Sequence, residues 1–128
     1  MNALFWVGLG GAIGACARFG VAQWVPVGQS GGFPWPTFIV NTVGALLIGF
    51  AVGWVGQSGW FIDYGRAFLV TGVLGGFTTF SAFSLEVVQL AQAGFATQAL
   101  AYALLSLVVC AAFAAVGLML GVALTASS

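Results

Sequence analysis

The chain has 128 residues, 62% of them hydrophobic, with two basic and two acidic side chains and no histidine. Charged residues make up roughly 25% of a typical soluble domain, so this composition excludes that class and indicates a membrane protein. An enzyme is not expected, because the sequence holds no activated-nucleophile constellation and no plausible metal cluster. We likewise expect no nucleic-acid partner.

Four apolar segments are predicted to cross the lipid bilayer, at about residues 3–24, 37–55, 64–93 and 95–124. One crossing of the roughly 30 Å hydrocarbon core takes about 20 residues. Residues rich in glycine, proline and serine separate the segments. We therefore predict an all-α integral membrane protein whose single transmembrane domain covers residues 1–128.

The ends of these segments carry no orientation signal. If the four spans alternate, both termini lie on one side, which we call face A, and the loop between the first two spans lies on face B. The tryptophans, which favour membrane interfaces, sort into Trp6, Trp54 and Trp60 near face A and Trp24 and Trp35 near face B. Arg18 lies toward face B and Arg66 toward face A. This balance predicts insertion in both orientations, as an antiparallel, dual-topology homodimer.

Polar and small residues recur every four positions in two spans. They are Thr37, Asn41, Ala45, Gly49 and Gly53 in the second span, and Gln98, Tyr102, Ser106 and Cys110 in the fourth. Either stripe can be packing, in which Asn41 bridges helices, or a ladder of hydroxyl and amide donors for an anion. Gly10 and Gly14 in the first span predict close helix packing.

Two charged residues lie toward face B. Arg18 is interpreted as a topology marker or as a charge in a vestibule. Glu86 allows three readings: a partner for Arg18, the mouth of a vestibule, or a carboxylate that couples to protons.

The stretch GGFTTFSAF, residues 75–83, interrupts the third span. That span is longer than one crossing needs, and Gly75 and Gly76 near its middle predict a helix broken mid-membrane by an unwound turn, a candidate ion site. Phe80 and Phe83 share a helix face. The positive edges of their rings can stabilise an anion, although such stripes can also be packing.

This stretch, together with GGAIGACARF near the N-terminus and TFIVNTVGALLIG in the second span, resembles the Fluc (CrcB) family of fluoride channels. Ala82 and Phe19 depart from the family, which often has threonine and tyrosine there. The resemblance implies that Phe80 and Phe83 meet fluoride edge-on and that Asn41 donates to the same ions. Tyr102 and Ser106, with Thr37, would extend the polar track.

The resemblance also implies a structural sodium ion (Na+), held by the backbone carbonyls of Gly75 and Thr78 at the centre of the dimer. The expected activity is passive export of fluoride, which lowers cytoplasmic fluoride, by a multi-pass protein of the bacterial inner (plasma) membrane. The alternative is a small dual-topology exporter of multiple drugs or cations. Such an exporter needs a membrane-embedded carboxylate.

Overall fold

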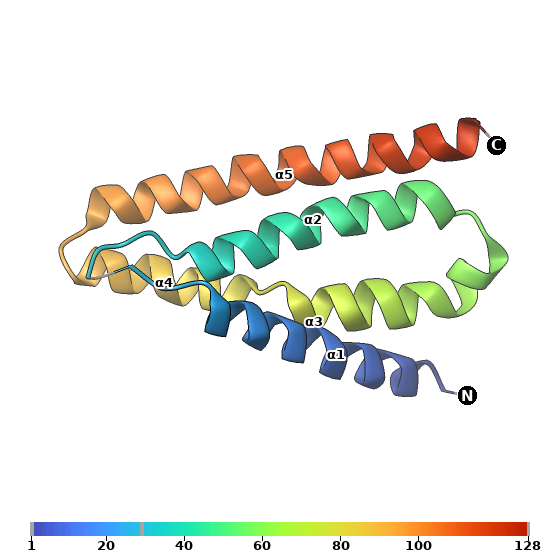
Figure 1. Cartoon of the computed structure of the whole chain (residues 1–128), viewed down its shortest axis with the longest axis horizontal. Helices are drawn as coiled ribbons and strands as arrows, with labels where there is room; N and C mark the ends of the chain where they lie inside the picture. Colours follow the sequence, from blue (N-terminus) through green and yellow to red (C-terminus); the bar gives the residue numbers. More distant parts are fainter. Residues whose placement is uncertain (1, 29, 128) are drawn as a thin grey trace.

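In the computed structural model, which describes residues 2–28 and 30–127, all regular structure in those ranges is helical (Figure 1). The elements are α1 (Ala3–Trp24), α2 (Trp35–Val55), the π-helix η1 (Phe61–Leu74), α3 (Gly75–Phe77), α4 (Phe80–Gln92) and α5 (Ala96–Ala126). Four helical stretches in the described ranges, with η1, α3 and α4 taken as one, are long and apolar enough to cross a membrane. The prediction of an all-α chain with four such helices is confirmed.

Local capping residues set the helix ends, some of which differ from the predicted bounds by a few residues. α2 begins at Trp35 rather than Thr37, because Pro36 is compatible with the first turn of a helix. The third span begins at Phe61 rather than Tyr64, since the Ser58 hydroxyl accepts a hydrogen bond from the Phe61 amide at 3.3 Å. Gly94 adopts a left-handed φ of 93° between α4 and α5, which reverses the chain.

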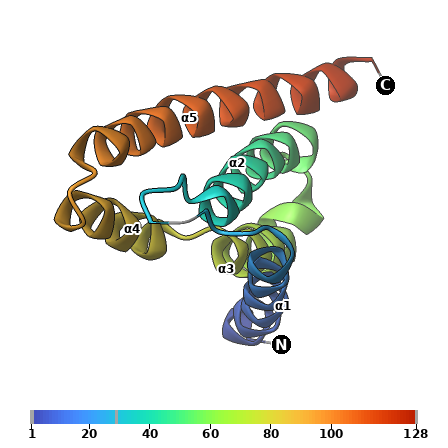
Figure 2. The ribbon, with the colours of Figure 1, turned by 60° about the vertical axis from the view of Figure 1, so that its left-hand side comes forward.

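The helices form two pairs, and α2 lies between α5 and the pair of α1 and η1 (Figures 1 and 2). Both chain ends lie at the end of the bundle that also holds the turn between α2 and η1 (Figure 1). Residues 25–28 and 30–34, which connect α1 to α2, and the turn between α4 and α5 lie at the opposite end (Figure 1). This arrangement agrees with alternating spans whose termini share face A.

Glycines allow the backbones of each pair to approach closely. A Cβ added at Gly49 of α2 would overlap the Ala114 carbonyl oxygen of α5, and one added at Gly14 of α1 would overlap the Val73 carbonyl oxygen of η1. Where lipid surrounds a protein, such close packing supplies much of the attraction between helices. The small residues predicted to pack in the first two spans therefore lie at helix contacts.

The third span is interrupted at Thr78 and Thr79, which are both extended, with ψ of 158° and 118°. Gly75 and Gly76 are helical, so the prediction that the turn unwinds at the glycines is wrong in position. Thr78 closes the last turn of α3, where its amide and its hydroxyl both donate to the Leu74 carbonyl, each at 2.9 Å. Thr79 then caps α4 by accepting from the Ala82 amide at 3.1 Å. The Thr79 hydroxyl thus satisfies an amide that has no helical partner at the start of α4, whereas glycine has no side chain to do so.

Candidate functional site

Two hollows meet at the interruption of the third span. The first, of about 770 Å³, lies between α1, loop residues 27–28 and 30–34, α2 and α4, and Arg18, Thr37 and Glu86 line it. We call it the entrance hollow. The second, of about 710 Å³, lies between α2, the third span and α5, and we call it the inner groove. Thr79 lines both, so the extended residues separate one space from the other.

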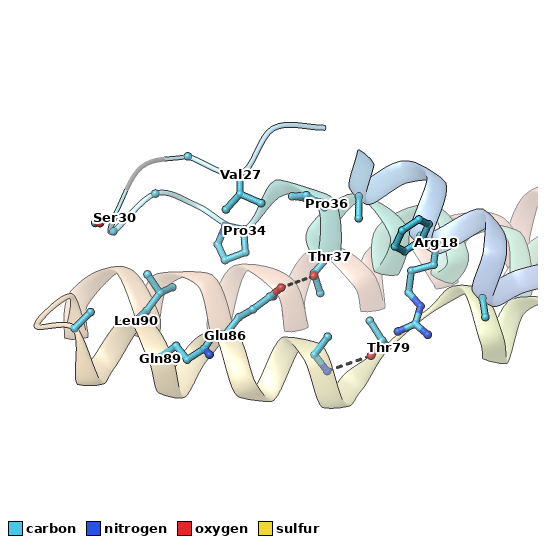
Figure 3. A pocket seen from close by; sticks show the side chains of 18 residues that line it. Arg18, Val27, Ser30, Pro34, Pro36, Thr37, Thr79, Glu86, Gln89 and Leu90 are labelled. Carbon is cyan, nitrogen blue, oxygen red and sulfur yellow. Dashed lines mark hydrogen bonds between the residues drawn. The ribbon is translucent and has the colours of Figure 1, made fainter. Parts of the chain in front are cut away.

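A carboxylate bonded to two hydroxyls connects the helices at the entrance hollow. The Thr37 hydroxyl donates to Glu86 Oε1 at 2.6 Å, and the Tyr102 hydroxyl donates to Oε2 at 2.8 Å. Figure 3 shows the bond between Thr37 and Glu86, with the Arg18 side chain pointing from α1 into the same hollow. No ion pair joins Arg18 to Glu86 or to another residue that the structure describes. Of the three readings of Glu86, pairing with Arg18 is therefore absent from this arrangement.

These bonds occupy two hydroxyls for which the family resemblance implies a place on the ion path. A hydroxyl has a single hydrogen to donate. Because Thr37 and Tyr102 both direct it at Glu86, neither can donate to an anion until the carboxylate releases it.

Asn41 satisfies the backbone that the interruption leaves unpaired. Its Oδ1 accepts from the Thr79 amide at 2.8 Å, and its Nδ2 donates to the Thr79 carbonyl at 3.0 Å. Unpaired backbone groups are costly among membrane helices, so this amide replaces the lost helical bonds. An asparagine amide carries two N–H donors, and the second has no partner among residues 2–28 and 30–127 while Asn41 lines the inner groove. Asn41 thus bridges helices and still keeps one donor for a ligand.

Aromatic rings and a free hydroxyl line the inner groove beside Asn41. The Phe80 side chain is 79% exposed, and its ring centroid lies 5.6 Å from that of Phe83 at an interplanar angle of 46°. On the far side, Phe83 makes an edge contact with Tyr102 at 5.1 Å. Ser106 is only 6% exposed, and its Oγ has no hydrogen-bond partner in the described chain. A buried, unsatisfied hydroxyl is unfavourable, which makes this donor a candidate ligand-binding group.

The structure brings most of the predicted site residues together. Those that line the inner groove are Asn41, Gly75, Thr78, Phe80, Phe83 and Ser106. Thr37 lines the entrance hollow instead, and the fully buried Tyr102 joins the two regions by its bond to Glu86 and its contact with Phe83. Sequence reasoning missed the bonding role of Glu86 and the central position of Thr79. The role of Thr79 could have been found from its position just before α4, because threonine commonly caps a helix there.

Among the residues that the structure describes, backbone oxygens near this turn suit a hard metal ion. The described residues contain no group of three or more histidine, cysteine, aspartate or glutamate side chains that could hold one. The Thr78 carbonyl, by contrast, accepts no hydrogen bond from the part of the chain that the structure describes. Carbonyl oxygens are ligands that hard cations accept, so the residues present fit a sodium site that uses this group.

Taken together, the fold and the two hollows define a small, multi-pass helical membrane protein with a path of hydroxyl, amide and aromatic groups between its helices. Comparison with known proteins agrees with this class. Residues 5–118 match the family model described as "CrcB-like protein, Camphor Resistance (CrcB)", and the chain belongs to this family.

Curated relatives cover nearly the whole chain. Proteins named "Fluoride-specific ion channel FluC" include one from Rhizobium meliloti, 42% identical over 93% of this chain and 97% of its own length. Another, from Novosphingobium aromaticivorans, is 45% identical over 96% of this chain and 100% of its own length. A third, from Thermus thermophilus, is 44% identical over 92% of each chain. The resemblance seen in the sequence motifs is therefore confirmed.

Proposed function

We propose that this chain is a fluoride-specific ion channel that lets fluoride leave the cytoplasm passively and so lowers its concentration there. The relatives carry that name across almost the full length of the chain. The structural observation that supports it most is the inner groove, whose described lining has no charged side chain. The free donor of Asn41, the unpartnered Ser106 hydroxyl and two phenylalanine rings face it instead.

This arrangement suits a small anion that loses part of its water. Arg18 places a positive charge in the entrance hollow that can attract an anion, while the Glu86 carboxylate in the same hollow is held by two hydroxyls. Beyond Thr79, amide and hydroxyl donors replace water around the ion, while positive ring edges contribute without a fixed charge. Fixed cations would bind the ion tightly, whereas weak donors also let it leave. For Thr37 and Tyr102 to serve the ion as well, their hydroxyls must turn from Glu86 toward it.

The relatives do not favour the alternative, a small exporter of drugs or cations. They are named ion channels, which also agrees with the prediction that the chain is not an enzyme. An exporter would use Glu86 as its cation-binding carboxylate, but here two hydroxyls hold that group.

Efflux from liposomes tests the proposed activity. Liposomes with the purified protein should release fluoride much faster than chloride, and Phe80→Ile should abolish or sharply slow the release while the protein stays assembled. Phe113→Ile is the matched control, since Phe113 is an exposed ring on α5 outside the inner groove. Fluoride release no faster than from empty liposomes would refute the channel, and proton-coupled cation uptake would favour the exporter.

We further propose that two copies assemble as an antiparallel homodimer in the plasma membrane of a bacterium, so that each copy's open groove is covered. The exposure of Phe80 and the location of Arg18 and Arg66 in opposite halves of the bundle support this assembly. Where two interrupted helices meet, the carbonyls of Thr78 and Gly75 would hold a sodium ion, which would neutralise oxygen dipoles at the junction. Replacing sodium by N-methylglucamine should then loosen the purified dimer.

Labelling in whole cells tests the dual topology. Ser127→Cys, in a background with Cys16→Ala and Cys110→Ala, places one thiol at the C-terminal end of the chain. With two opposed orientations, an impermeant reagent should reach about half of the copies in intact cells and all of them after permeabilisation. Labelling of all copies or of none in intact cells would exclude the antiparallel dimer.

A further inference from the structure

An aromatic pocket lies far from the interruption, at the end of the bundle that carries both termini. Its volume is about 330 Å³, and its lining consists of Trp6, Trp60, Tyr64, Gly65 and Phe68. Four of these five residues are aromatic and none is charged. The volume is at the lower end of the roughly 300–1,000 Å³ common for ligand sites, so a small chemical group fits it better than a peptide.

The walls of the aromatic pocket differ in exposure. Trp6 is partly buried and meets Phe68 edge to face at 6.0 Å and 86°, which holds both rings in place. Trp60 and Tyr64 are 64% and 50% exposed. Gly65 adds no side chain, and a Cβ there would come within 2.5 Å of the Phe61 ring. The result is a fixed inner wall, an open outer wall and an unobstructed space between them.

The chemistry of this pocket favours a cation. Ring faces carry negative electrostatic potential and attract ammonium groups, quaternary ammonium above all. Asp63 and Arg66 lie within one helical turn of Tyr64, both side chains are exposed, and neither forms an ion pair within the described ranges. Neither of these charged residues lines the pocket, so its own lining is aromatic and uncharged. A group with a positive charge at its tip complements a pocket lined by such rings.

The position of the pocket indicates where such a group comes from. Trp60 and Tyr64 begin the third membrane-spanning stretch, and exposed tryptophan and tyrosine at span ends lie at the level of lipid headgroups. Beyond the proposed channel function, we propose that the aromatic pocket binds the ammonium group of a phospholipid headgroup. In an antiparallel dimer each leaflet would present one such site.

Native mass spectrometry with two matched lipids tests this proposal. The lipids share acyl chains and phosphate, and one carries choline while the other carries 3,3-dimethylbutanol, in which carbon replaces the ammonium nitrogen. We expect the choline lipid to bind the purified protein about fivefold or more tightly, as cation–π contacts with several rings would give. Trp60→Leu should remove that preference. Trp54→Leu should leave it intact, because Trp54 is a similarly exposed ring at the same end of the bundle but outside the pocket.

Each other result overturns the site. Equal binding of the two lipids removes the role of the cation. A preference that survives Trp60→Leu, or that Trp54→Leu also abolishes, places the lipid elsewhere. Dissociation of the dimer in Trp60→Leu would show that the pocket is a protein contact. If Trp60→Leu does not fold, Tyr64→Leu decides the question by the same criteria, with Trp6→Phe, which keeps a ring, expected to retain the preference.

Discussion

Replacing Asn41 by alanine tests the central feature of this fold, the interruption held by a side chain from another helix. The substitution removes two hydrogen bonds, of 2.8 and 3.0 Å, to the backbone of Thr79, a residue only 8% exposed. Each buried group left unpaired costs about 1–3 kcal/mol, so in a dry core the free energy of unfolding would fall by about 2–6 kcal/mol. Side-chain bonds between membrane helices average only about 0.6 kcal/mol each.

The surroundings of Thr79 decide whether the loss is closer to the value for a dry core or to the average for bonds between membrane helices. Thr79 lines both hollows, so water can reach its backbone and replace part of what Asn41 supplied. We therefore expect Asn41→Ala to lower the free energy of unfolding by about 2 kcal/mol. It should also slow fluoride efflux sharply, since the free amide donor to the groove disappears with the rest of the side chain.

Reversible unfolding in mixed detergent measures the first effect, and liposome efflux measures the second. Thr42→Val on the same helix is the control, because the Thr42 hydroxyl makes only a weak contact with the Cys110 sulfur at 3.8 Å. If Asn41→Ala unfolds no more easily than Thr42→Val, the amide does not hold the turn and this account of the interruption fails.

Three further substitutions separate packing from function. Ser106→Ala should leave the free energy of unfolding unchanged or slightly raised, because it removes a buried hydroxyl without a partner in the described chain. It should still slow fluoride efflux about tenfold, the value of one hydrogen bond to an ion. Unaltered efflux would remove Ser106 from the path. Tyr102→Phe should lower the free energy of unfolding by about 1–3 kcal/mol, since Glu86 loses a hydrogen bond of 2.8 Å. An unchanged unfolding curve would show that this bond does not stabilise the fold. Gly49→Val should prevent close approach of α2 and α5 and lower the free energy of unfolding by more than about 2 kcal/mol. Gly8→Val should be tolerated, because a Cβ at Gly8 meets nothing within 4 Å. Equal losses of unfolding free energy in the two variants would contradict the helix contact.

Hydropathy located the four spans because it depends only on composition along the chain. The spacing of Gly10 and Gly14, and of Gly49 and Gly53, also indicated close helix contacts correctly, since residues four apart share a helix face. What spacing cannot supply is the partner helix. Gly49 meets α5 and Gly14 meets η1, and these pairings depend on the packing of the whole chain.

The position of the interruption shows a different limit. Gly75 and Gly76 drew attention because glycine weakens a helix, but a helix ends where other groups satisfy its unpaired backbone atoms. Those groups belong to Thr79 and to Asn41, which is 38 residues away in sequence from Thr79.

The same reasoning explains why Asn41 did not have to be either a helix bridge or an ion ligand. One oxygen and one N–H suffice to satisfy the Thr79 backbone, and the second N–H remains at the inner groove. Because Asn41 stabilises the extended backbone of Thr79, it also lies beside the inner groove at that interruption. A membrane-embedded amide can therefore be a structural group and a ligand-binding group at once, where the backbone that it satisfies also lines the ligand's groove.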